Sequence, residues 1–172
     1  MATATITPDQ NTVLVEVFIA APPERVFQAI SDPEQLSRWW GQKDLYRITD
    51  RHADIRVGGK WYSAGVGADG KEFNVQGEYL EIDPPRRLVH TWIPSYRAGL
   101  KTVVYWELEA QAIHGLHPSG PKKAGTGTLV KLRHEGFVGH PQAAQDHGRG
   151  WKRVFGWLEA FVLRDETVDT RP

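Results

Sequence analysis

One stretch near the C-terminus is the part of this sequence that can form a long helix. Between Pro141 and Arg164, apolar and aromatic residues recur at steps of three or four, which places them on one face of a helix. These residues are Ala144, His147, Trp151, Val154, Leu158, Phe161 and Val162. Because the predicted face is wide and aromatic, it must be buried, and the rest of the chain must supply the layer that covers it.

The rest of the chain favours strands. Residues 13–19 alternate in hydrophobicity with the two-residue period of a strand. Further strands are predicted at residues 54–57, 61–62, 73–82, 88–93, 102–110 and 126–135, with turns at Gly58-Gly59 and Asp69-Gly70. Two short helices are expected after the first strand, one entered through Pro22-Pro23 and one capped by Ser31 or Asp32. This order predicts an α+β fold in which a curved antiparallel sheet packs on one helix.

The length of 172 residues suits one domain with a sizeable core. We expect that domain to span residues 13–164, between a flexible N-terminus at 1–12 and a flexible tail at 165–172. Residues 114–125 contain three glycines and two prolines in twelve positions, which is typical of an exposed loop inserted between strands.

Composition excludes several classes of function. Lysine plus arginine equals aspartate plus glutamate at 21 each, which argues against nucleic acid or a polybasic membrane surface as the partner. The absence of cysteine excludes a disulfide frame, a thiolate metal site and a cysteine nucleophile. Apolar runs are only a few residues long, so no membrane span is predicted and the expected location is cytoplasmic.

Several blocks of sequence resemble the START-like (SRPBCC) superfamily, and more narrowly its branch similar to the activator of heat-shock protein 90 ATPase, the Aha-type domain. The blocks are Ala21-Pro22-Pro23-Glu24-Arg25-Val26-Phe27, Asp32-Pro33-Glu34-Gln35-Leu36 leading to Trp39-Trp40-Gly41, Asp54-Ile55-Arg56-Val57-Gly58-Gly59-Lys60-Trp61, Gly77-Glu78-Tyr79, Asp83-Pro84-Pro85, Thr91-Trp92, His134-Glu135-Gly136-Phe137 and Gly150-Trp151. The resemblance covers about residues 13–163. It implies a helix-grip fold (START/Bet v 1-like), in which six to seven antiparallel strands surround a long C-terminal helix and enclose a cavity.

Strand alternation predicts which side chains face that helix. Leu88, His90 and Trp92 share one face of their strand, as do Thr102, Val104, Trp106 and Leu108, and Thr128, Val130, Leu132 and His134 on two others. The candidate ligand-binding residues are Trp40, Trp61, His90, Trp92, Trp106, His134, His147, Trp151 and Phe155. Two alternatives stay open: the tryptophans form a solid core, and His134 is a core histidine bonded to a backbone carbonyl.

Other motifs give weaker signals. His114 and His117 have a spacing that could serve a metal, but they lie in a Gly/Pro loop without a nearby carboxylate, so no metal or cofactor is predicted. Asp54 and Arg56 are expected to form a surface ion pair and not a catalytic dyad. The glycines of residues 65–70 open no helix and are interpreted as a hairpin turn. The sequence also contains no Gly-x-Ser-x-Gly motif.

Three functions compete at this stage. The first is binding of a small apolar or aromatic ligand in the cavity, with His134 and His90 or His147 orienting a polar group. The second, implied by the resemblance, is a co-chaperone module that binds a chaperone, stimulates its ATPase and serves the stress response. The third is a cyclase- or hydrolase-like enzyme that uses a cavity histidine as general acid or base. Homodimerisation through a strand edge is compatible with the fold.

Overall fold

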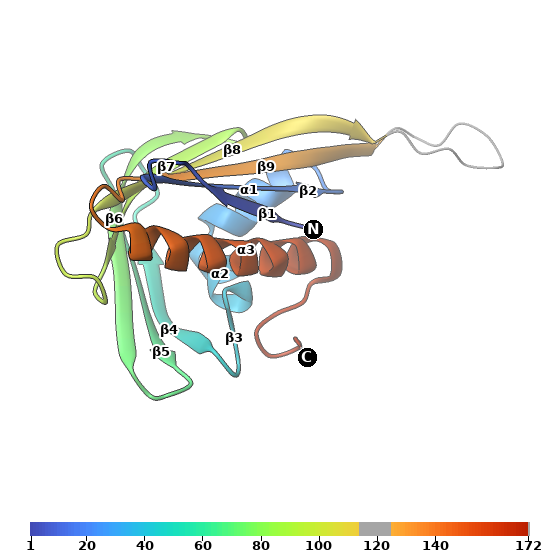
Figure 1. The fold of residues 1–172 in the computed structure, drawn as a ribbon. Helices are drawn as coiled ribbons and strands as arrows, with labels where there is room; N and C mark the ends of the chain where they lie inside the picture. The colour runs from blue at the N-terminus through green and yellow to red at the C-terminus, as the bar shows by residue number, and fades with distance from the viewer. Residues whose placement is uncertain (114–124, 172) are drawn as a thin grey trace, which may run out of the picture.

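The computed structural model describes residues 1–113 and 125–171 (Figure 1). The strands are β1 (Thr3–Ile6), β2 (Thr12–Ile19), β3 (Gly41–Gln42), β4 (Tyr46–Ala53), β5 (Lys60–Gly67), β6 (Glu72–Asp83), β7 (Arg87–Pro94), β8 (Thr102–Ile113) and β9 (Gly125–Glu135). The helices are α1 (Pro23–Ser31), α2 (Pro33–Trp39) and α3 (Pro141–Arg164). The predicted α+β helix-grip architecture is confirmed.

All described strands belong to one antiparallel sheet, in the order β1-β2-β9-β8-β7-β6-β5-β4-β3. The sheet curves around α3, which packs against β2 and β1 near one edge (Figure 1). The strands β4 and β5, at the other end of the sheet, bend away from α3. This divergence leaves space between the sheet and the helix, which positions the site described below.

The two short helices meet at Asp32, whose side chain accepts a hydrogen bond from the Glu34 amide at 3.0 Å and so caps α2. Proline occupies the first turn of both helices, where its missing N–H leaves no bond unmade. The fully buried Trp39 links the pair, because its indole N–H donates to the Ala29 carbonyl at 2.9 Å. The predicted pair of short helices is therefore confirmed, with Trp40 forming the C-terminal cap of α2.

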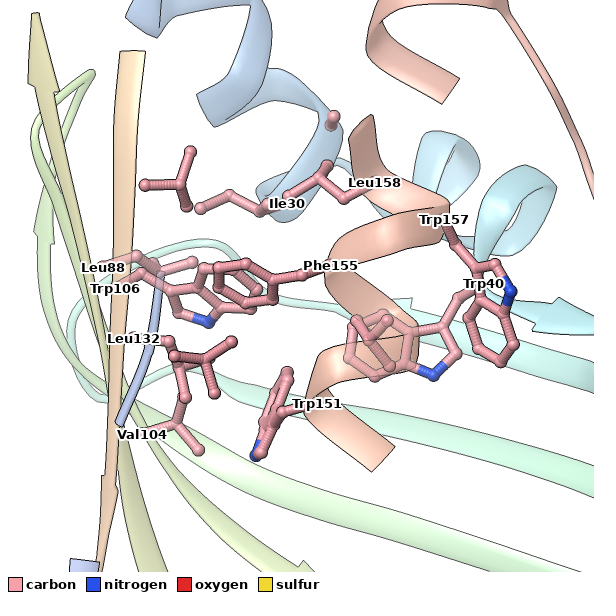
Figure 2. Close-up of a cluster of buried hydrophobic side chains, with 14 of the residues drawn as sticks. Ile30, Trp40, Leu88, Val104, Trp106, Leu132, Trp151, Phe155, Trp157 and Leu158 are labelled. Atoms are coloured by element: carbon pink, nitrogen blue, oxygen red, sulfur yellow. The ribbon is translucent and has the colours of Figure 1, made fainter. Parts of the chain in front are cut away.

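The core lies where the apolar face of α3 meets β2, β9 and β8. Phe155 of α3 and Trp106 of β8 stack face to face, with ring centroids 5.4 Å apart and planes 4° from parallel. Figure 2 shows these two rings beside Leu88, Leu132 and neighbouring aliphatic side chains. Both rings are almost fully buried, so this stack fixes how closely the helix approaches the sheet.

The structure corrects one part of the predicted sheet. Residues 54–57 were expected to form a strand, but they lie in the connection between β4 and β5, and the strand comes earlier, at Tyr46–Ala53. The two very short or polar strands β3 and β4, together with β1, raise the sheet from the predicted six or seven strands to nine. Asp54 and Arg56 do form the expected exposed ion pair, at 2.6 Å.

Both ends of the chain make specific contacts where flexible segments were expected. Residues 3–6 pair with β2 as β1. After α3, the Val168 amide donates to the Arg38 carbonyl at 2.9 Å, and the Arg171 guanidinium donates to the Trp39 carbonyl at 3.2 Å. These hydrogen bonds attach to the domain two segments that composition alone predicted to be flexible. Most of the predicted loop insertion, residues 114–124, lies outside the described residues.

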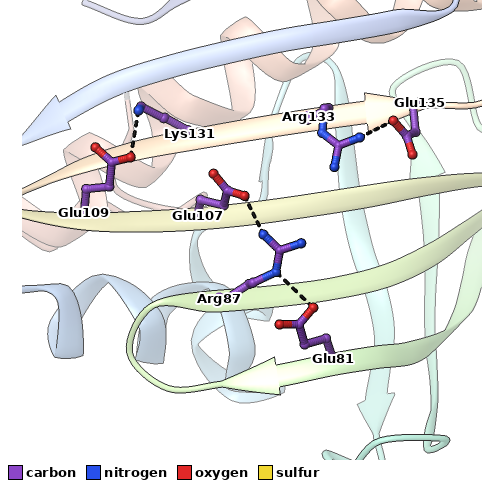
Figure 3. Close-up of polar contacts among 7 residues, drawn as sticks. All are labelled: Glu81, Arg87, Glu107, Glu109, Lys131, Arg133 and Glu135. Carbon is purple, nitrogen blue, oxygen red and sulfur yellow. Dashed lines mark hydrogen bonds and ion pairs between the residues drawn. The ribbon is translucent and has the colours of Figure 1, made fainter.

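The outer face of the sheet carries alternating charges on β6 to β9 (Figure 3). Arg87 bridges two strands, since its Nε donates to Glu81 at 2.9 Å and its Nη1 donates to Glu107. Lys131 pairs with Glu109 at 2.7 Å. Glu107, Glu109 and Lys131 lie on the solvent side of the sheet, whereas Trp106, Leu108 and Val130, which precede them along the strands, are buried.

Replacing Arg87 with methionine is expected to lower the free energy of unfolding by roughly 1 kcal/mol, because half-exposed ion pairs contribute little in water. The loss should shrink in 1 M NaCl, where screening removes most of the attraction. Urea denaturation measures both values. Arg86→Met is the matched control, since the more exposed Arg86 pairs only with Asp83, three residues away. An equal loss in both variants would contradict the role of the two-strand bridge.

Candidate functional site

A cavity of about 680 Å³ lies between α3, the α1–α2 pair and the diverging strands β4 to β8. Its walls are mainly apolar and include nine aromatic residues: Trp40, Tyr46, Trp61, Phe73, Tyr79, Trp92, Tyr96, Trp106 and Trp151. Several of these rings contact one another, and Trp92 lies centrally, with centroids 5.6 Å from Trp61 and 5.4 Å from Trp151. The volume and the apolar walls are typical of a small-molecule site.

Close packing at Gly77 shapes one wall. The Gly77 position faces Trp61 across the β5–β6 pair. A Cβ atom at Gly77 would lie 2.5 Å from the Trp61 indole nitrogen and 2.1 Å from the Thr91 carbonyl oxygen, so only glycine fits there. The missing side chain allows the indole of Trp61, which lines the cavity, to pack closely against Gly77.

Seven of the nine candidate residues line the cavity: Trp40, Trp61, His90, Trp92, Trp106, His147 and Trp151. Phe155 and His134 do not. Phe155 stacks on the far side of Trp106, and His134 is fully buried behind Trp92 and Trp151. Sequence alternation identified the inward face of each strand, but it could not distinguish the layer next to the cavity from the layer behind it.

His134 belongs to a closed hydrogen-bond chain. Because the Trp151 indole N–H can only donate, His134 Nδ1 accepts its hydrogen bond, at 2.9 Å. Nε2 then carries the proton and donates to Thr102 Oγ1 at 2.6 Å, and the Thr102 hydroxyl donates to the Trp92 carbonyl at 3.1 Å. Burial, reinforced by His147 and His90, lowers the His134 pKa well below its ordinary value. The geometry therefore supports the alternative of a satisfied core histidine, with side chains as its partners.

The two histidines on the cavity wall are also held neutral. His90 donates from Nδ1 to the Thr91 carbonyl at 3.1 Å and accepts from the Trp106 indole at 3.3 Å. Burial lowers the pKa of His90 to about 4, and the nearby charge of Arg51 acts in the same direction. His147 donates to the Ala143 carbonyl at 2.8 Å, and burial lowers its pKa as well. Its Nε2 is buried without a partner among the described residues.

Sequence reasoning missed one cavity residue of a different kind, Arg51. Tyr46 and Ile48 of β4 face inward, so strict alternation would place Arg51 outside with Arg47. A bulge intervenes: Ile48 pairs with Gly65 and Asp50 with Ala64, which leaves Thr49 without a partner across the sheet. The bulge reverses the alternation and turns Arg51 into the cavity, opposite Ser63.

Arg51 is enclosed by polar and aromatic groups. Its Nη2 donates to Ser63 Oγ at 3.0 Å, and the guanidinium carbon lies 5.0 Å from the Trp40 ring centroid. The Trp40 indole in turn donates to the Tyr46 hydroxyl at 3.0 Å. Burial lowers the pKa of Arg51 to about 10, which leaves the side chain charged at neutral pH. Arg51 keeps a part of its surface accessible because that surface borders the cavity.

The described residues contain no group of three or more His, Cys, Asp or Glu side chains placed to hold a metal ion. The two loop histidines considered for that role, His114 and His117, lie outside the described residues. None of the helices in the described part of the chain combines the length and apolarity that crossing a membrane requires.

The curved sheet and the long C-terminal helix with a cavity between them, together with a family match over residues 20–115, define a START-like protein of the Aha-type SRPBCC group. Its family follows from a match over residues 20–115 to the family described as Activator of Hsp90 ATPase homolog 1-like protein. The chain belongs to this family, as the sequence blocks predicted. No match to the chain was found among curated proteins.

Solved structures with the same fold come from several bacteria. A protein from Chromobacterium violaceum, CV1439, is 26% identical, with a TM-score of 0.66 over 88% of this chain and 96% of that one. An AHSA1 protein from Silicibacter pomeroyi is 23% identical, with a TM-score of 0.69 over 90% and 99%. CalU16 from Micromonospora echinospora is 22% identical, with a TM-score of 0.61 over 96% and 85%. The latter two likenesses concern the fold alone.

Proposed function

We propose that this protein binds a small, largely apolar or aromatic molecule in the cavity between the sheet and α3. The observation that carries the proposal is the cavity itself, about 680 Å³ in volume and walled by aromatic rings. A core built only for stability fills its interior to the density of an organic crystal. A space of this size, lined by rings with a few polar groups, instead matches a site that receives a drug-sized molecule.

Different residues of the cavity wall would contribute different interactions to ligand binding. Trp92 and Trp151 offer large, rigid apolar surfaces, which give contact area at a small cost in conformational entropy. The neutral imidazole of His147 has a free acceptor, Nε2, which would suit a ligand hydroxyl or amide. His134, already saturated with hydrogen bonds, would support the wall from behind.

The test is titration of the protein with fatty acids, aromatic polyketides, steroids and flavonoids, followed by tryptophan fluorescence. At least one class is expected to quench saturably. Trp92→Phe should raise the dissociation constant of that ligand about tenfold, because a central wall of the site shrinks. Trp157→Phe is the matched control, since Trp157 is equally buried but outside the cavity lining.

Two outcomes would contradict this proposal. A flat response to every class would favour the alternative in which an exposed surface binds a chaperone, and a chaperone pull-down would follow. An equal loss of affinity in both tryptophan variants would place the binding somewhere other than the cavity.

A further inference from the structure

We propose that the ligand of this cavity is an amphipathic anion, an apolar or aromatic skeleton that carries a carboxylate or a comparable acid group, and that Arg51 binds the acid group. The inference rests on the proposed function and adds the chemical class of the ligand. It starts from a half-buried cation on the cavity wall whose counter-charge is missing from the described residues.

Arg51 differs from Arg47 on the same strand and from Arg87 on β7. Arg47 pairs with Asp169 at 3.2 Å, and Arg87 pairs with Glu81 and Glu107. Arg51, by contrast, forms no ion pair with a carboxylate among the described residues. Its one hydrogen bond goes to Ser63, and its Nε is buried without an acceptor in the described part of the chain.

A buried, unpaired charge with unused donors is costly to keep in a protein interior. The interaction with the Trp40 ring offsets a part of that cost, but a ring supplies no acceptor for the N–H groups. A carboxylate supplies both the opposite charge and the acceptor atoms, and guanidinium binds it with two parallel hydrogen bonds. An acid group on the ligand would therefore complete what the protein leaves open.

Other donors converge on the same place. Ser63 lies directly opposite Arg51 in the β4–β5 pair, and Trp61 lies two residues before Ser63 on the same face. Because Ser63 Oγ accepts from Arg51, its own hydroxyl proton is available to a ligand. The Trp61 indole N–H is buried and has no acceptor among the described residues. That nitrogen packs against Gly77, so the guanidinium of Arg51 and the hydroxyl of Ser63 are the adjacent donors on this wall of the cavity.

The carboxylates that line the cavity form no ion pair with Arg51, because they are exposed to solvent or paired with other arginines. Asp69 and Glu72 are exposed to solvent, and Asp146 pairs with Arg97 and Arg149. The polar wall around Arg51 and the apolar walls of the rest of the cavity together suit a ligand that has one acidic group on a hydrocarbon ring or chain. A neutral molecule of the same shape would leave the guanidinium unpaired.

The test compares two probes with the same aromatic skeleton, 8-anilinonaphthalene-1-sulfonate and the neutral N-phenyl-1-naphthylamine, by isothermal calorimetry on the folded protein. The wild type is expected to bind the sulfonate at least tenfold more tightly than the neutral amine. Arg51→Met should weaken binding of the sulfonate ten- to hundredfold and change binding of the neutral probe less than twofold. Arg47→Met is the matched control, because it removes the same charge from the same strand outside the cavity.

The outcomes separate this inference from the proposed function. Equal binding of both probes by the wild type, or an undiminished sulfonate affinity in a folded Arg51→Met variant, would overturn the assignment of Arg51 and leave apolar ligand binding intact. Failure of both probes to bind would contradict the proposed function and the inference with it. Because the wild-type preference needs no variant, the inference stays testable even if Arg51→Met does not fold.

Discussion

Lowering the pH from 7 to 5 is expected to reduce the free energy of unfolding by several kcal/mol. His90, His134 and His147 are buried as neutral rings, and burial lowers all three pKa values. In the unfolded chain each ring takes up a proton near its ordinary pKa of about 6.5. Stability is therefore fully present above about pH 6.5 and is lost as the pH falls towards the folded pKa, which for His90 is about 4.

The expected size of this loss follows from proton linkage. Each neutral buried histidine costs up to about 1.4 kcal/mol per pH unit below its unfolded pKa, and the three contributions add. Urea denaturation between pH 7.5 and 5 measures the slope, and calorimetry in two buffers measures proton uptake on unfolding, which should be about two to three protons at pH 5.5. His90→Phe should remove about one of them, because the pKa of His90 in the folded protein is about 4. Uptake of less than about one proton by the wild type would contradict the neutral assignment.

Phe155→Ala is expected to destabilise the protein by about 3 to 5 kcal/mol, a large part of the stability of a domain of this size. Phe155 is fully buried, and its ring stacks on Trp106 at the contact between α3 and the sheet. Truncation removes that stack and leaves a void that a rigid indole and a strand cannot easily fill.

The matched control for this substitution is Leu163→Ala on the same helix, where the leucine is 41% exposed. This change should cost less than about 1 kcal/mol, because a large part of its side chain already meets water. Chemical denaturation of both variants gives the comparison. A loss below about 1.5 kcal/mol for Phe155→Ala would mean that the stack does not fix the position of α3.

The buried faces of the strands and of α3 could be predicted well from the sequence, because hydrophobic periodicity depends only on residues close together in the chain. On β8, the residues Thr102, Val104, Trp106 and Leu108 alternate with polar or half-exposed neighbours, and all four are buried. The helix α3 was predicted with its observed boundaries for the same reason, since its apolar residues recur with the helical period from one end to the other. The loop histidines and the 114–124 segment remain predictions.

The parts that the sequence did not reveal depend on contacts distant in the chain. β4 is polar and sits near the sheet edge, so its residues carry no hydrophobic alternation, and the bulge at Thr49 has no glycine or proline to mark it. His134 could be placed inside from its register, but its saturation depends on Thr102 and Trp151, which come from another strand and from α3. Only tertiary structure distinguishes a bonded histidine from one free to meet a ligand.

The bulge at Thr49 decides which charged residue of β4 faces the cavity, so the charge of the cavity depends on the register of the strand as well as on its composition. If Thr49 were instead paired within the ladder, strict alternation would turn Arg51 towards solvent and place Asp50 or His52 inside. The charge that a ligand meets in this fold could thus change sign through a one-residue shift in register near a sheet edge, with every wall tryptophan kept. Relatives with matching aromatic residues can therefore differ in ligand charge, and pairwise identity would not reveal it.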